Sequence, residues 1–361
     1  MSYRRTEART AYIEWAKLRA SAKFNLAASG VKGLALSELP VRIEDLQLSA
    51  MGSYGYRPLV ERLARRYGVD TENVVGAIGT SMANYLAMSA LVEPGDEVIV
   101  EEPTYEPMVE IARYLGASVM RLRRRAEDGW QVRVADLEKI ISKKTRLVVL
   151  TNLHNPSGAF LHDETLRAIG EVTGGVGACV LVDEVYRELL FDRPSRPAFH
   201  LGTNFMVTSS LTKAYGLSGL RCGWILAAPQ LAERMWRQND LFGNIPAHLT
   251  ELLSVVALDH LETIRERARS LLAANWKLLD AFLAEHQELE VQRPLGGTIV
   301  FARVPGGDAD AFCARLRERY ETSVVPGRFF ETPDRVRIGI GNEGEEVREG
   351  LRRVSATLRE S

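Results

Sequence analysis

Short apolar runs alternate with amphipathic stretches along most of the chain. The apolar runs are rich in β-branched residues, which favours strands, and the amphipathic stretches between them favour helices. Strands are expected at Val74–Ile78, Glu97–Val100, Ser118–Leu122, Leu147–Leu150, Cys179–Val182, Phe205–Ser209 and Trp224–Ala227. The alternation predicts an α/β fold with a mostly parallel seven-stranded sheet.

Helices are expected between these strands, and the pattern changes after the last of them. The predicted helices are Met82–Leu91, Pro107–Leu115, Val134–Ile141 and Asp163–Val172. Apolar residues from about 231 to 288 recur at three- and four-residue spacing, which predicts a helix-rich stretch. Two strand-like runs, Thr298–Val304 and Arg335–Ile340, then flank a helical stretch at Ala309–Tyr320. We therefore expect a large α/β domain over residues 45–240, and a smaller α+β domain formed by residues 1–44 and 241–361.

The composition is that of an ordinary globular protein. Of the 361 residues, 46% are hydrophobic and 26% are charged, so the chain can bury a large core. The net charge of -1 gives no reason to expect nucleic acid or a membrane surface as a partner, and no apolar run reaches the length of a membrane span. Three cysteines without CxxC spacing indicate a reducing compartment, so we expect a cytoplasmic protein. The six histidines show no metal-ligand spacing, and no metal is expected.

Residues that could bind a ligand or take part in a reaction follow the ends of several predicted strands, where open α/β sheets bind their ligands. Gly79, Thr80 and Ser81 form a small-residue turn that opens a helix, and such a turn can bind a phosphate. Tyr105 follows the second strand and could stack on a flat ligand. Asn155 follows the fourth strand in a turn sequence that presents its amide.

The fifth and sixth strands end in the most informative residues. Asp183 ends a fully apolar strand, so its carboxylate needs a cationic or hydrogen-bonding partner, and Tyr186 follows closely. The sixth strand ends in Ser209 and Ser210 and is followed by Lys213. Each signal alone has an ordinary structural explanation. Their occurrence at five strand ends of one chain favours a ligand site.

The stretch from Ser209 to Trp224, SSLTKAYGLSGLRCGW, resembles the cofactor-lysine signature of the class I/II aminotransferases. A serine lies three residues before Lys213 and an arginine lies eight residues after it. The resemblance extends from the segment at Asn25–Gly30 to Arg337, nearly the whole chain. It implies the fold of the fold-type I enzymes that use pyridoxal 5′-phosphate (PLP).

The resemblance also implies a role for each matching residue. Lys213 would hold PLP as a Schiff base and move the Cα proton, and Asp183 would pair with the pyridine nitrogen. Asn155 and Tyr186 would bind the phenolic oxygen of the ring, on which Tyr105 would stack. The phosphate would be held by Gly79, Thr80, Ser81, Ser210 and Arg221.

Three further roles follow from the resemblance. Arg337 would clamp the substrate α-carboxylate; Arg335 lies on the same strand face, so the choice between them rests on the resemblance. Gly30 resembles a loop glycine that closes over the substrate. Tyr54 and Tyr56 lie on either side of Gly55; the resemblance implies that one of them reaches the phosphate of a partner subunit, and we favour Tyr54. The enzyme would then be a homodimer with shared active sites.

The function predicted is PLP-dependent transfer of an amino group between an amino acid and a 2-oxo acid. Related enzymes with the same residues catalyse β-elimination, decarboxylation or oxidation instead. A serine hydrolase using Ser81 is a distant alternative, with His248, His260 or His286 as its base, and a non-enzymatic PLP-sensing module is another. The identity of the substrate is not predicted. The basic run Arg121–Arg125 is interpreted as a solvated strand end.

Overall fold

A seven-stranded sheet forms the centre of the molecule in the structure, a computed structural model that describes residues 8–50, 52–193 and 196–360. Its strand order is β2-β8-β7-β6-β5-β3-β4. β8 is antiparallel to both of its neighbours and the remaining pairs are parallel, which confirms the mostly parallel sheet. The strands are β2 (Val74–Ile78), β3 (Glu97–Glu102), β4 (Ser118–Arg123), β5 (Thr145–Thr151), β6 (Cys179–Asp183), β7 (Phe205–Ser210) and β8 (Cys222–Leu226).

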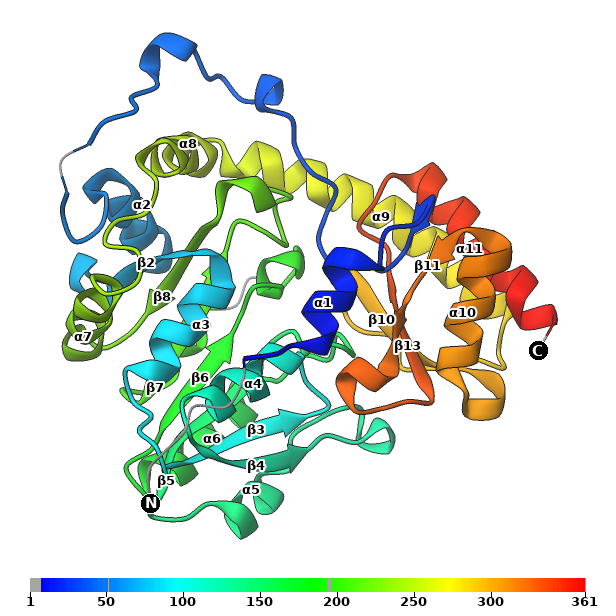
Figure 1. Cartoon of the computed structure of the whole chain (residues 1–361), viewed down its shortest axis with the longest axis horizontal. Coiled ribbons are helices and arrows are strands. Elements are labelled where there is room, and N and C mark those ends of the chain that lie inside the picture. The colour runs from blue at the N-terminus through cyan, green and yellow to red at the C-terminus, as the bar shows by residue number, and fades with distance from the viewer. Residues whose placement is uncertain (1–7, 51, 194–195, 361) are drawn as a thin grey trace.

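Helices cover both faces of this sheet (Figure 1). Val148 and Leu150 of β5 belong to one apolar cluster, and Leu147 and Val149 belong to another, so the strand is buried on both faces. One cluster includes residues of α2 (Arg57–Tyr67), α6 (Asp163–Gly174) and α9 (Leu261–Glu285). The other includes residues of α3 (Gly79–Ser89), α4 (Glu106–Tyr114) and α7 (Pro229–Asn239). The remaining helices of this part are α5 (Val134–Ile140) and α8 (His248–Asp259).

The C-terminal part forms a smaller antiparallel sheet of order β12-β13-β10-β9. Its strands are β9 (Glu290–Val291), β10 (Ile299–Arg303), β12 (Val325–Pro326) and β13 (Arg335–Gly339). α10 (Ala309–Tyr320) packs against α11 (Gly344–Arg359), which also packs along α9. The N-terminal arm joins this part, because β1 (Phe24–Asn25) pairs with β11 (Thr322–Ser323).

The N-terminal helix α1 (Ala11–Leu18) lies between the two sheets in Figure 1. Its Tyr12 ring packs against Phe329 and Phe330 from the C-terminal part and against Tyr105 from the central part. The helix therefore bridges the region where both parts meet. No helix in the described part of the chain is long and apolar enough to cross a membrane.

Each predicted helix is observed, with shifts at its ends, whereas α1, α2 and α11 were not predicted. α3 begins at Gly79, three residues before the predicted start at Met82. Thr80 and Ser81 in its first turn line a cavity instead of the core. This turn therefore lacks the apolar residues from whose spacing the helix was predicted. β8 likewise begins at Cys222, two residues earlier than predicted.

Candidate active site

A cavity with an empty volume of about 870 Å³ opens where β5, β6 and β7 end and α3 begins. The lining residues come from α1, the N-terminal arm, α3, the segment after β3, and the ends of β5, β6 and β7 with the segments that follow them: Tyr12, Ile13, Ala16, Ser29, Thr80, Ser81, Asn84, Tyr105, Thr151, Asn155, Asp183, Val185, Tyr186, Ser210, Thr212, Lys213 and Arg221. Nine residues that the sequence assigned to cofactor binding are thereby gathered around one space.

Lys213 extends into this cavity from the segment after β7, and its Nζ donates a hydrogen bond to Ser29 Oγ at 3.0 Å. Burial lowers the pKa of the Lys213 amine, and the nearby Arg337 and Arg221 lower it further, although Tyr12 and Asp183 act in the opposite direction. A lowered pKa increases the fraction of neutral amine, which is the nucleophilic form.

Asp183 ends β6 and is 5% exposed. Its Oδ2 accepts a hydrogen bond from Asn84 Nδ2 at 2.9 Å, and its Oδ1 accepts one from Val185 N at 3.0 Å. Thr208 Oγ1 donates to Asn84 Oδ1 at 2.6 Å, which turns the Asn84 amide nitrogen toward Asp183. Burial raises the pKa of the Asp183 carboxyl to about 6. A cationic group in the cavity would therefore bind strongly to this carboxylate.

The opposite end of the cavity is built to receive an anion. Gly79 has a φ of +73°, and α3 starts there with unpaired backbone N–H groups and the positive end of its dipole. Arg221 lies against this turn, since a Cβ atom built on Gly79 would be 2.3 Å from Arg221 Nη2. Thr80 Oγ1 is buried and has no hydrogen-bond partner among the described residues. Ser210 borders the same space.

Asn155 and Arg337 meet beside the cavity. Arg337, 1% exposed, donates from Nη1 to Asn155 Oδ1 at 2.9 Å and from Nη2 to the Tyr12 hydroxyl at 2.9 Å. Because arginine can only donate, the Asn155 oxygen must face it, and the Asn155 amide nitrogen points away. Arg335 donates instead to the backbone oxygens of Glu290 and Phe301. Of the two candidate arginines, Arg337 is therefore the one beside the cavity.

Two aromatic residues complete the walls. Tyr186 is buried, and burial raises the pKa of its hydroxyl, while a hydrogen bond with Ser29 lowers it. Tyr105 forms an edge-to-face contact with Tyr12, with ring centroids 5.7 Å apart. Burial raises the pKa of Tyr105 as well, so both phenols are protonated at neutral pH.

Four of the predicted residues are not among those that line this cavity: Gly79 and Arg337 lie directly beside it, whereas Tyr54 and Gly30 border other hollows. Tyr54 is 63% exposed and its hydroxyl donates to Asp240 Oδ2 at 3.0 Å, in a separate surface hollow. Gly30 borders an adjoining hollow, where an added Cβ would lie 3.4 Å from Lys213 Cδ. The predicted roles of Tyr54 and Gly30 remain predictions.

Sequence reasoning missed five polar residues of the site: Tyr12, Ser29, Asn84, Thr151 and Thr212. Asn84 had a detectable signal, because it is a single amide in an otherwise apolar helical stretch and needed a buried partner. Tyr12 and Ser29 belong to the N-terminal arm, and nothing in their local sequence relates them to the end of the sheet. The structure brings them there through the packing of α1 and the pairing of β1 with β11.

Comparison with known proteins agrees with this geometry. The family model for aminotransferase class I and II matches residues 45–354. The chain belongs to this family. It is 31% identical to the capreomycidine synthase of Streptomyces vinaceus, over 93% of this chain and 90% of that protein. It is 32% identical to the arginine–pyruvate transaminase AruH of Pseudomonas aeruginosa, over 83% of this chain and 80% of that protein.

Solved structures of related enzymes superpose closely on the class I and II fold of this chain. A PLP-dependent aminotransferase from Streptococcus suis has a TM-score of 0.92 at 28% identity, covering 98% of this chain and 99% of that one. The PLP-dependent cyclase OrfR has a TM-score of 0.89 at 27% identity and 99% coverage of both chains. These similarities confirm the fold-type I architecture.

PLP is the cofactor of class I and II aminotransferases, and the groups around the cavity fit its parts. A phosphate would provide acceptors for the partnerless Thr80 hydroxyl and for the first N–H groups of α3. A protonated ring nitrogen would provide Asp183 with the cationic partner that a buried carboxylate requires. When bound, PLP supplies an aldehyde that condenses with amines and a ring that accepts electrons from a breaking bond.

Proposed function

We propose that this enzyme transfers an amino group between an amino acid and a 2-oxo acid by means of Lys213. The observation that carries the proposal is the composition of the single cavity described above. A lysine with a lowered pKa shares it with a buried carboxylate and an anion-binding helix end. Membership of the aminotransferase family supports the same reaction.

Each residue of the chain has a distinct part in this proposal. Lys213 would take the proton from the substrate Cα and deliver it to another atom, because its amine extends into the cavity and burial lowers its pKa. Asp183 would hold a proton on the ring nitrogen by supplying a buried negative charge. The phenolic oxygen would be bound by Asn155 and Tyr186. Tyr105 would stack on the ring, and Gly79, Thr80, Ser81, Ser210 and Arg221 would anchor the phosphate.

Substrate binding would depend on Arg337. Its planar guanidinium suits a two-point contact with an α-carboxylate, and the incoming carboxylate would replace the Tyr12 hydroxyl on Nη2. We also propose that Asn155 supports this contact. Because Gly30 has no side chain, the backbone of its loop can lie close to Lys213.

Another reaction on the same cofactor is the main alternative. It is favoured by the similarity of this chain to a capreomycidine synthase and to a PLP-dependent cyclase, because neither name is that of an aminotransferase. A serine hydrolase is disfavoured, because no histidine is among the residues that line the cavity beside Ser81. A PLP-sensing module without activity is disfavoured by the similarity to named enzymes over most of the chain.

The assembly and organisation predicted from the sequence are also proposals. We propose a homodimer in which Tyr54 reaches the partner's site, which is supported by its exposure and by its distance from the cavity of its own chain. Residues 45–240 would form the cofactor-binding domain, and residues 1–44 with 241–361 the smaller one, in keeping with the separation of the seven-stranded sheet from the two smaller sheets. A cytoplasmic location is supported by three unpaired cysteines.

A single-turnover assay tests the proposed reaction. The PLP-loaded protein is mixed with one amino acid at a time, without any 2-oxo acid, while absorbance and released 2-oxo acid are measured. Transamination predicts a lasting spectral change and release of one 2-oxo acid per site, after which the reaction stops until an acceptor is added. Continuous product formation without an acceptor, or release of ammonia, would instead establish a lyase-type reaction.

A further inference from the structure

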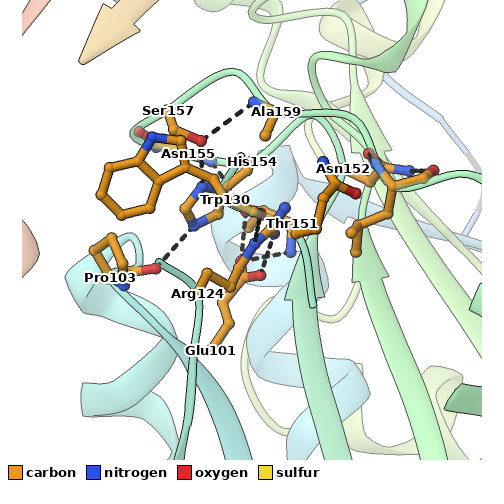
Figure 2. A network of polar contacts seen from close by, with 12 residues as sticks. Glu101, Pro103, Arg124, Trp130, Thr151, Asn152, His154, Asn155, Ser157 and Ala159 are labelled. Atoms are coloured by element: carbon orange, nitrogen blue, oxygen red, sulfur yellow. Dashed lines mark hydrogen bonds and ion pairs between the residues drawn. The ribbon is translucent and has the colours of Figure 1, made fainter. Parts of the chain in front are cut away.

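The basic run after β4 contains a buried charge where a solvated strand end was expected. The Arg124 side chain is fully buried, so that interpretation was wrong at this position. Arg124 Nη1 donates to Glu101 Oε2 at 2.7 Å, and Arg124 Nε donates to the Trp130 carbonyl oxygen. Glu101 on β3 is fully buried as well. The two residues form an ion pair without access to solvent, close to the end of the sheet (Figure 2).

The second oxygen of Glu101 points toward the cavity wall. Glu101 Oε1 accepts two hydrogen bonds from Thr151, from its backbone N at 2.7 Å and from its hydroxyl at 2.6 Å. Since the hydroxyl proton is committed to Glu101, the Thr151 oxygen is left as an acceptor. It accepts a hydrogen bond from Asn155 N at 3.0 Å. A direct chain of hydrogen bonds thus connects the ion pair with Asn155.

The turn that carries Asn155 is held from its other side by His154. The His154 ring is fully buried, with Nδ1 2.6 Å from Ser157 Oγ and Nε2 2.9 Å from the Pro103 carbonyl oxygen (Figure 2). Burial keeps the pKa of this imidazole well below its ordinary value, so the ring is neutral. These contacts fix the far end of the turn. Its start is held by Asn152, whose side chain bonds to the backbone of Leu161, and by the Thr151 hydroxyl, which contacts Asn155 itself.

Asn155 is the residue at which small displacements matter. Its Oδ1 accepts from Arg337, and its opposite nitrogen is oriented toward the cavity by that contact. A shift of the Asn155 backbone would move both ends of the amide. It would disturb the proposed contact with the phenolic oxygen of the cofactor and the support of the carboxylate clamp together.

We propose that Glu101 is a positioning residue of this enzyme, whose buried carboxylate fixes the Thr151 hydroxyl and thereby the Asn155 amide. Arg124 neutralises Glu101, so that a negative charge can be kept in the core without a net charge beside Asp183. Neither Glu101 nor Arg124 lines the cavity, and both act through Thr151. The proposal rests on the proposed role of Asn155 in binding the cofactor.

Two substitutions at Thr151 test this connection while both members of the ion pair stay in place. Thr151→Val has nearly the same shape and keeps the backbone bond to Glu101, but it removes the oxygen that binds Asn155 N. Thr151→Ser keeps that oxygen and is the matched control. In the cofactor-free protein we expect Thr151→Val to accelerate hydrogen exchange of segment 152–158 about tenfold, and Thr151→Ser to leave it within about twofold. Unchanged exchange in Thr151→Val would overturn the proposal, whatever reaction the enzyme catalyses.

A double-mutant cycle with Asn155→Ala then tests the functional consequence. Thr151→Val alone should lower kcat/KM about tenfold and shift the pH midpoint of the cofactor absorbance, and Thr151→Ser should restore both. In the Asn155→Ala background the same substitution should change kcat/KM less than about twofold. An effect of equal size in both backgrounds would show that Thr151 acts independently of Asn155, which contradicts the proposal.

Glu101→Gln extends the test to the carboxylate. We expect it to accelerate exchange of segment 152–158 as Thr151→Val does, because an amide accepts the Thr151 hydroxyl bond less strongly. It also leaves Arg124 with a weaker buried partner, so its thermal unfolding is measured in parallel. If this variant does not fold, the two Thr151 variants still decide the proposal. A folded Glu101→Gln protein with the exchange of the parent would contradict it.

Discussion

The Asp183 carboxylate lies in the core with an amide and a backbone N–H as its donors, and this arrangement costs stability unless a cation is bound. Its pKa of about 6 compares with an ordinary value of 3.8. Protons therefore bind the folded protein more tightly than the unfolded chain. The resulting stabilisation is present below about pH 4 and is lost as the pH rises through about 6.

We expect Asp183→Asn to remove this pH dependence from the cofactor-free protein. Relative to the parent, its free energy of unfolding should increase by about 3 kcal/mol between pH 4 and pH 7, because the neutral amide has no ionisation to disfavour. Urea unfolding at several pH values measures the difference. Parallel curves for the two proteins would contradict the assigned burial. The same variant should lose most of its activity when loaded with PLP.

Adding a single Cβ atom at Gly79 tests whether this turn binds the phosphate. Gly79→Ala places a methyl group 2.3 Å from the unmoved Arg221 Nη2 and must displace the guanidinium. We expect PLP affinity to fall about tenfold, the loss of one charge-assisted contact. Gly95→Ala is the matched control, since Gly95 also has a positive φ, of +95°, but nothing lies within 4 Å of its added Cβ. Equal affinities in the two variants would contradict the role of Arg221.

Residues within one continuous motif could be predicted from the sequence, and residues brought in by packing could not. Lys213 and Arg221 belong to one stretch whose spacing is informative, and Asp183 stands out after an apolar strand. The buried state of Arg124 depends on Glu101, 23 positions earlier, and no local pattern pairs them. Long-range partners of this kind become visible only when the strands are assembled.

Helix α1 is the element that closes the site, and its N-terminus is anchored on α4. Glu106 Oε1 and Oε2 accept hydrogen bonds from the backbone N atoms of Ala11 and Tyr12 at 3.1 and 2.6 Å. A carboxylate at this position satisfies the first N–H groups of the helix and complements its dipole. This contact holds Tyr12 over Arg337.

We expect Glu106→Ala to loosen α1, since such a contact contributes about 1 kcal/mol. Hydrogen exchange of residues 11–18 should accelerate several-fold, and KM for the amino acid should change more than kcat. Glu110→Ala is the control, because Glu110 lies on the same helix and pairs with Arg113 instead. If both variants exchange at the rate of the parent, the anchor is not at Glu106.

The strands of the central sheet and the helices between them followed from the sequence, whereas α1, α2 and α11, and the ends and directions of the elements, needed the structure. Apolar β-branched runs identified all seven strands of the central sheet, since these strands are buried on both faces. The antiparallel direction of β8 was not predicted, because direction depends on the short connection between β7 and β8 and not on the apolar pattern of the strand.

In the proposed dimer, Tyr54 of one subunit contributes to the site of the other. Tyr54→Phe should lower PLP affinity about tenfold through loss of a hydrogen bond to the phosphate in the partner's site. Tyr56→Phe should have little effect, since the Tyr56 ring packs against His248, with centroids 5.0 Å apart. PLP titration of both variants, with light scattering for the mass, tests this. A monomer, or a larger effect at Tyr56, would contradict the shared site.

We propose above all that Lys213 binds the cofactor in the cavity formed by β5, β6, β7 and α3. The most direct measurement is borohydride reduction of the PLP-loaded protein, followed by digestion and mass spectrometry to locate the labelled residue. We expect a single label on Lys213 and none in the Lys213→Ala variant. A label on another lysine, or an equally labelled Lys213→Ala protein, would contradict it.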